Sequence, residues 1–136
     1  MPEDYAAAAN RHFRDAALLE RSRRFANADQ LFGFAAECAI KRALMGLPGF
    51  LSGDKLAQAY HKHVDDLWDS VQLQSVQRRY PALVFQLKRR SPFSDWSTDQ
   101  RYGPDDAVSA AALERHRSAA KRILGSVGLN GARAEA

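Results

Sequence analysis

The stretch Leu31–Leu47, LFGFAAECAIKRALMGL, decides how this chain folds. Its seventeen residues would form a helix of roughly 25 Å. A surface helix is apolar on one side only, but here apolar side chains cover most of the circumference. Gly33, Glu37 and Lys41 follow i, i+4, i+8 spacing and leave one narrow polar stripe. We therefore expect a central helix, buried within the chain or shared with a second copy.

Length and composition limit the number of domains and the classes of partner that this chain can have. The 136 residues predict one helical domain over residues 1–128 and a flexible tail over 129–136. The net charge of +4 and pI near 9.5 permit an anionic partner without requiring one. Cys38 is the single cysteine, and its apolar setting predicts a small buried hydrophobe. No leader or membrane-length apolar run is evident, so we expect a cytoplasmic protein with no membrane partner.

Apolar periodicity predicts an all-α fold of four main helices with one or two extra short ones. Asn27 or Asp29 is expected to cap the second helix, and Gly46 to stop it. The pattern favours an up-and-down four-helix bundle, and the over-apolar second helix favours a homodimer. The alternative is that its alanines pack closely within a monomer. The expected helices cover approximately residues 3–23, 27–45, 64–77, 81–87 and 104–125, with a short helix or turn at 55–60.

The charges in the central helix allow two interpretations. Glu37 and Lys41 stand in the favoured i, i+4 order and can satisfy each other as a local ion pair. Alternatively, they line a polar groove between helices or subunits. A charge in an apolar helix is costly unless paired, so both interpretations require the partner.

Two further segments suit contact with phosphate. Residues 70–94 contain no acid but carry five cations among several aromatics, which fits either nucleic-acid contact or a solvated basic face. The loop from Phe93 to Pro104 contains Trp96, which we expect in the core. It also contains Arg101 beside Tyr102, where a guanidinium can fork onto phosphate and a ring can stack on a base. The five cations are Arg78, Arg79, Lys88, Arg89 and Arg90.

Several classes of site are excluded by their missing motifs. The chain has no GxxxxGK[ST], GxGxxG, HExxH or GxSxG pattern. One cysteine and four dispersed histidines do not form a zinc site. We therefore expect no metal and no cofactor.

The pattern over residues 5–125 resembles the HEPN family, the higher eukaryotes and prokaryotes nucleotide-binding domains. The resemblance implies a four-helix bundle that usually dimerises. Many such proteins are ribonucleases, often toxins paired with a nucleotidyltransferase-fold antitoxin, whose active site is Arg, four to six residues, then His. This chain has no such pair, and Lys55 before His61 is the nearest substitute. The matching stretches are Tyr5 with Ala16-Ala17-Leu18-Leu19, AAECAIKRALMG from Ala35 to Gly46, His61 before Val64…Leu67-Trp68, and Arg101-Tyr102-Gly-Pro.

Three functions follow from this resemblance. The first is a non-catalytic nucleotide- or RNA-binding protein that uses the predicted contacts Glu37, Lys41, His61, Arg101 and Tyr102. The second is a metal-independent endoribonuclease, with His61 as general acid or base and Arg101 or Lys55 stabilising phosphorane charge. The third is a pure protein-interaction module. Its partner would be a nucleotidyltransferase-type protein in a toxin–antitoxin or defence system.

Overall fold

The computed structural model describes residues 2–131 and shows a predominantly helical, all-α protein. Within that range the three longest helices are α1 (Tyr5–Arg21), α2 (Phe25–Met45) and α6 (Ala110–Ser126). The segment between α2 and α6 carries shorter elements. These are η1 (Pro48–Phe50), β1 (Leu51–Ser52), β2 (Lys55–Leu56), η2 (Gln58–Tyr60), α3 (Val64–Leu67), α4 (Leu73–Val76), α5 (Pro81–Leu87) and η3 (Thr98–Tyr102).

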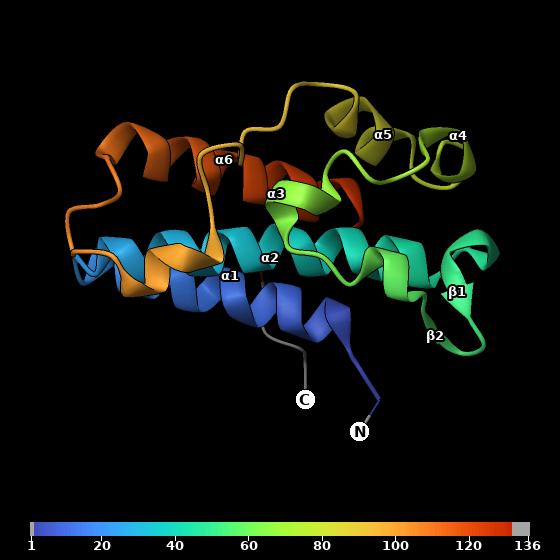
Figure 1. Cartoon of the computed structure of the whole chain (residues 1–136), viewed down its shortest axis with the longest axis horizontal. Coiled ribbons are helices and arrows are strands. Elements are labelled where there is room, and N and C mark those ends of the chain that lie inside the picture. Colours follow the sequence, from blue (N-terminus) through green and yellow to red (C-terminus); the bar gives the residue numbers. More distant parts are fainter. Residues whose placement is uncertain (1, 132–136) are drawn as a thin grey trace.

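Helix α2 is the centre of the molecule. Figure 1 shows it between α1 on one side and α3, α5 and α6 on the other. Of its 21 residues, 14 are buried, including all three members of the predicted polar stripe. The chain itself therefore covers this helix, and its all-round apolar surface does not require a second copy. Cys38 is buried on α2, as predicted.

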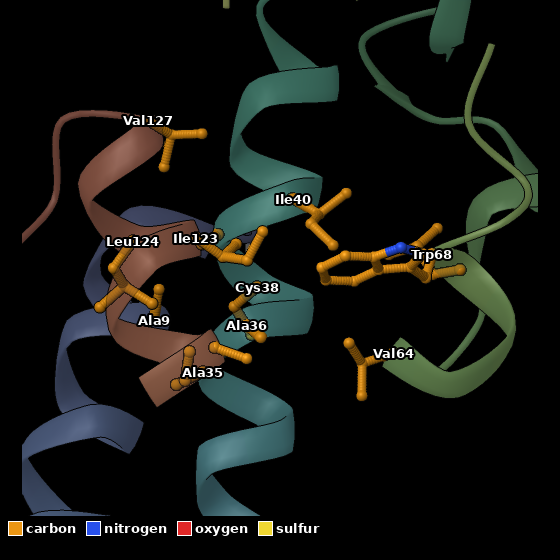
Figure 2. Packing of buried hydrophobic residues seen from close by; sticks show 14 of the residues in the cluster. Ala9, Ala35, Ala36, Cys38, Ile40, Val64, Trp68, Ile123, Leu124 and Val127 are labelled. Atoms are coloured by element: carbon orange, nitrogen blue, oxygen red, sulfur yellow. The ribbon is translucent and has the colours of Figure 1, made fainter. Parts of the chain in front are cut away.

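Small side chains let the long helices approach one another. Ala9 and Ala16 of α1 are fully buried against the core, as are Ala35 and Ala36 of α2. Larger groups fill the other side, where Figure 2 shows Ile40 of α2 pointing toward the ring of Trp68. Burying an aliphatic side chain of that size stabilises the fold by about 1.5–3 kcal/mol.

The loop between α1 and α2 contains neither glycine nor proline, yet it makes a defined helix stop. Arg23 adopts a left-handed backbone with φ of 62°. Its N–H donates to Glu20 O at 3.0 Å, and the Arg24 N–H donates to Leu19 O at 2.8 Å. This pair of bonds is the Schellman pattern, and α6 ends in the same pattern with glycine, Gly128, in the left-handed position.

Several element boundaries differ from those expected. Helix α2 begins at Phe25, so the predictions of Asn27 or Asp29 as its cap were wrong. Helix α6 begins at Ala110, where the Ser109 hydroxyl accepts from the Ala112 N–H, rather than at Pro104. The helix expected over 64–77 is divided into α3 and α4, which are separated by the bend around Ser70.

A small antiparallel hairpin replaces part of the helix or turn predicted over residues 55–60. Leu51 pairs with Leu56 and Ser52 with Lys55, and Gly53 supplies the positive φ of 66° that the tight turn requires. Leu56 is buried and anchors the hairpin to the core. Strands of two residues are too short for a period-2 pattern, which explains why the sequence did not indicate them.

The predicted C-terminal tail is described only in its first part. Leu129 packs against the core, and the Gly131 N–H donates to Asn10 Oδ1 at 2.8 Å. Residues 132–136 lie outside the described residues.

Candidate functional site

The charged stripe of α2 forms the local ion pair that the sequence indicated. Lys41 Nζ donates to Glu37 Oε2 at 2.9 Å, and both side chains are about nine-tenths buried. The other carboxylate oxygen of Glu37 lies 2.9 Å from Nδ1 of His63, whose side chain is half exposed. Glu37 is therefore fully engaged by two partners, and the histidine involved is His63 rather than His61.

The remaining predicted contacts lie elsewhere. His61 Nε2 is hydrogen-bonded to Leu56 O at 2.9 Å, beside the β-hairpin. Arg101 Nε donates to Thr98 O at 2.8 Å, and its guanidinium lies 5.1 Å from the centre of the exposed Tyr102 ring. Figure 1 places η3 and the β1–β2 hairpin toward opposite ends of the long axis. The structure therefore forms the Arg101–Tyr102 contact but does not bring His61 to it.

Gly33, the third member of the stripe, is covered by an aromatic ring. A Cβ built on Gly33 would lie 2.1 Å from Cε2 of Trp96, so the residue must be glycine for the indole to seat. Trp96 is 1% exposed, which confirms that it belongs to the core. Its Nε1 donates to Asp29 O at 3.1 Å, which fixes the 93–97 segment against α2.

The most strongly built polar cluster was not among the predicted contacts. His116 of α6 is 1% exposed and lies between two carboxylates. Its Nδ1 is 2.6 Å from Asp29 Oδ1, and its Nε2 is 2.7 Å from Asp95 Oδ1. Carboxylate oxygens only accept, so the arrangement suits a doubly protonated imidazolium that donates from both nitrogens. We call Asp29, His116 and Asp95 the buried triad.

Further contacts hold the buried triad in place. Gln100 Nε2 donates to the second oxygen of Asp29 at 2.9 Å, and the Phe93 ring stacks on the imidazole at 5.3 Å between centroids and 18° between planes. Asp29 is 0% exposed, so these bonds supply its required partners. The triad ties α2, α6 and the 93–100 segment together.

The charges of the triad shift two pKa values. Burial alone would lower the pKa of His116, but the hydrogen bonds and charges of Asp29 and Asp95 outweigh it and raise the pKa above 6.5. Burial acts to raise the pKa of Asp95, but Arg115 and His116 outweigh that effect and lower it below 3.8. Both shifts favour the charged forms.

Asp95 also lines a pocket beside α5 and α6. The pocket has a volume of about 510 Å³, and its charged lining is four arginines and one carboxylate. Arg115 Nη1 donates to both oxygens of Asp95, at 2.9 and 2.8 Å. We call this the arginine pocket. It is lined by Trp68, Gln86, Arg89, Arg90, Ser91, Pro92, Ser94, Asp95, Arg115 and Arg122.

The arginine side chains of the pocket differ in the number of hydrogen-bond partners that they have. Arg122 Nε donates weakly to Gln86 Oε1 at 3.3 Å. The side chains of Arg89 and Arg90 are exposed and make no hydrogen bond or ion pair within residues 2–131. The backbone of Arg89 is nevertheless anchored, because its carbonyl accepts from Trp68 Nε1 at 3.0 Å. Two arginines whose side chains have no partner among residues 2–131 therefore line the pocket, and the backbone of one of them, Arg89, is anchored.

The sequence indicated some of the residues of the arginine pocket and of the buried triad. Arg89 and Arg90 belong to the acid-free stretch already noted, and the helical spacing of Ala112, His116 and Ile123 places a histidine on the apolar face of α6. The partners of His116 are 87 and 21 residues away along the chain, so no spacing rule could have assigned them. Arg115 and Arg122 were missed for the same reason.

Two further features are absent from residues 2–131, a group of metal-ligating side chains and a helix suited to span a membrane. Among residues 2–131, His, Cys, Asp and Glu side chains nowhere gather in a group of three or more suited to a metal ion. In the same range, none of the helices combines the length and apolar character that crossing a membrane requires.

No family model matches the chain, and neither the curated proteins nor the solved structures contain a match.

Proposed function

We propose that this chain is a HEPN-like, non-catalytic protein that binds the phosphate groups of a nucleotide or RNA. The observation that supports this most directly is the arginine pocket, whose lining includes four arginines and one carboxylate. Arginine is the side chain best suited to phosphate, because its planar donors match the oxygens of that group. A volume of about 510 Å³ lies within the range typical of small-molecule sites.

Two exposed aromatic side chains of this protein favour a nucleic-acid ligand over a generic anion. Helix α5 carries Phe85, which is 64% exposed and stands four residues before Arg89 in the sequence. An exposed ring beside cations offers a stacking surface for a base. The Arg101–Tyr102 contact on η3 is a second surface of the same chemistry.

A binding role is favoured over catalysis because no acid–base group is free in the pocket. Asp95 is held by Arg115 and His116, and the imidazole of His116 is buried beneath it. A general acid or base must reach the ligand within hydrogen-bond distance. The alternative of a metal-independent endoribonuclease predicts cleavage of a mixed RNA pool, which the proposed function does not.

The HEPN-like assignment also includes an up-and-down four-helix bundle, a homodimer and a nucleotidyltransferase-type protein partner. Helices α1, α2 and α6 supply three members of the bundle, and we assign the place of the fourth to the α3–α5 segment. Light scattering of the purified protein tests the dimer. Co-expression with a nucleotidyltransferase encoded beside it tests the partner and the interaction-module alternative.

The decisive experiment measures RNA binding after removal of the two unpaired arginines. We expect Arg89→Ala with Arg90→Ala to weaken binding of a short labelled single-stranded RNA about tenfold or more. The salt slope should also fall by about one to two, because two phosphate contacts are lost. Fluorescence anisotropy at several salt concentrations measures both quantities.

A matched control removes two exposed arginines that do not line the pocket. Arg11→Ala with Arg42→Ala changes the net charge equally but acts on α1 and α2. It should alter affinity by less than about twofold. Equal weakening by both double variants, or binding that does not depend on salt, would overturn the arginine pocket as the site.

A further inference from the structure

Asp95 occupies the site that a ligand phosphate would take on Arg115. Both of its oxygens lie within 2.9 Å of Arg115 Nη1, and both side chains line the arginine pocket. Each of the two side chains is 46% exposed, so a ligand in the pocket can reach this ion pair. An incoming anion must therefore displace Asp95 from Arg115 or bind beside its negative charge.

His116 keeps Asp95 at the pocket in both cases. Its Nε2 holds Oδ1 of Asp95 from below at 2.7 Å, and its other nitrogen is fixed by the fully buried Asp29. Asp95 therefore stays at the pocket even when its contact with Arg115 is broken. The carboxylate acts as a permanent negative charge that every ligand meets.

This arrangement discriminates between ligand phosphates by charge. An internal phosphodiester carries one negative charge, so replacing Asp95 on Arg115 exchanges one monoanion for another and leaves the carboxylate with one partner fewer. A terminal phosphate carries about −1.5 to −2 at neutral pH and three acceptor oxygens. It can bind Arg115 together with Arg89 or Arg90 and so outweigh the repulsion from Asp95.

We propose that the arginine pocket selects a terminal phosphate or polyphosphate group, and that Asp95 enforces this selection against internal phosphodiesters. The inference rests on the proposed function and specifies its ligand. Asp95 is a specificity-determining residue, because it excludes weakly charged groups by competing for Arg115. The ligand class is therefore a nucleotide or an RNA end that bears a terminal phosphate.

The test compares three short RNAs in the same anisotropy assay. Two share one sequence and differ in a 5′-phosphate or 5′-hydroxyl end. The third has a 5′-hydroxyl and is lengthened by two nucleotides, so that its total charge matches that of the phosphorylated RNA. We expect the wild-type protein to prefer the phosphorylated RNA about tenfold over both others.

Asp95→Asn should remove most of that preference. Asparagine can still accept from His116, but it does not hold Arg115 as an ion pair or repel a diester. Binding of the 5′-hydroxyl RNA should strengthen about tenfold, and the preference should fall to about threefold or less. Asp54→Asn is the matched control, because it makes the same charge change at an exposed residue of the turn between β1 and β2 and should leave the preference intact.

A double variant makes the test independent of simple charge removal. In an Arg115→Gln background, Asp95→Asn should strengthen diester binding much less than tenfold, because only the charge repulsion remains to be relieved and the contested guanidinium is gone. If Asp95→Asn does not fold, Arg115→Gln alone decides, because it should also abolish the preference by weakening the phosphorylated RNA.

Different failures point to different conclusions. A wild-type protein that binds all three RNAs equally, or an Asp95→Asn variant that keeps the full preference, would overturn the selection while leaving phosphate binding intact. A wild-type protein that binds none of them would overturn the proposed function itself.

Discussion

Two buried acids on α2 form clusters of very different construction. Asp29 and Glu37 are eight residues apart, which is roughly 12 Å along the helix. Glu37 is paired with Lys41 on the next turn of its own helix and with the half-exposed His63. Asp29 is paired with His116, 87 residues away, and with Gln100, 71 residues away. The first cluster is built on one i, i+4 pair and reaches solvent through His63, whereas the second joins residues far apart in the sequence and reaches solvent only through Asp95.

Because of this difference, the two clusters have different structural roles. The Glu37 cluster satisfies charges that α2 introduces itself. The buried triad joins three segments that the chain brings together only on folding, and its outer member forms part of the arginine pocket. We therefore expect the triad to matter for both stability and the shape of the pocket, and the Glu37 cluster to matter mainly for local stability.

The largest expected effect is that of His116→Ala. Removing one partner of a buried ion pair typically costs about 3–5 kcal/mol, because the remaining charge loses its compensation. Here the residual charge is Asp29, which has no exposed surface. We expect a loss of this size in the free energy of unfolding, measured by chemical denaturation.

Lys41→Ala is the comparison for that variant. It also removes one partner of a buried carboxylate, but Glu37 retains His63, which is half exposed. We expect a loss of about 1–2 kcal/mol. Equal losses in the two variants would show that distance along the chain and access to water do not distinguish the clusters.

A second, smaller effect is expected from Gly33→Ala, at the point between the two clusters. The new methyl group would meet the Trp96 indole, which is buried and bonded to Asp29 O. Overpacking of this kind costs about 1–3 kcal/mol, partly offset by the better helix propensity of alanine. Circular dichroism during thermal unfolding measures the change.

Gly125→Ala is the control for the glycine variant. Gly125 lies in α6, and a Cβ built there meets no atom within 4 Å. It should stabilise the protein by up to about 1 kcal/mol through helix propensity alone. If both substitutions stabilised the protein, the Trp96 ring would have room to move, and the 93–97 segment would not be fixed as tightly as its contacts indicate.

The same contrast explains how much the sequence predicted. The apolar pattern identified the central helix and the burial of Cys38, the Gly46 stop signal identified the end of α2 at Met45, and the size and apolar character of Trp96 indicated its burial. The i, i+4 rule found the Glu37–Lys41 pair. All of these signals act over a few residues.

What the sequence did not predict depends on long-range contact or on unusual local geometry. Asp29 looked like a helix cap because aspartate is favoured there, whereas the fold places it inside α2 opposite His116. The α1–α2 stop was only weakly indicated, since Arg23 adopts the left-handed backbone that glycine usually supplies. The arginine pocket is lined by residues between Trp68 and Arg122, and only Arg89 and Arg90 were visible in the sequence as part of a basic stretch.

The smallest expected effect is a pH dependence that the triad gives to stability. The raised pKa of His116 means that the folded protein binds this proton more tightly than the unfolded chain does. The resulting stability is complete below about pH 6.5 and is lost as the pH rises through the raised value. The loss should be smaller than that in His116→Ala, because a neutral imidazole still donates one hydrogen bond to a carboxylate.

Asp95 and His12 act in the opposite direction and must be separated from this effect. The lowered pKa of Asp95 gives stability that is present above pH 3.8 and lost as the pH falls through the lowered value. Burial, followed by the charge of Arg11, lowers the pKa of His12, so its contribution also falls as the medium becomes acidic. Melting temperatures of the wild type and His116→Ala across pH 5–9 isolate His116, since His12 contributes equally to both. The difference between the two profiles should shrink as the pH rises above 6.5, and a difference that stays constant would mean that His116 carries no extra proton in the folded protein.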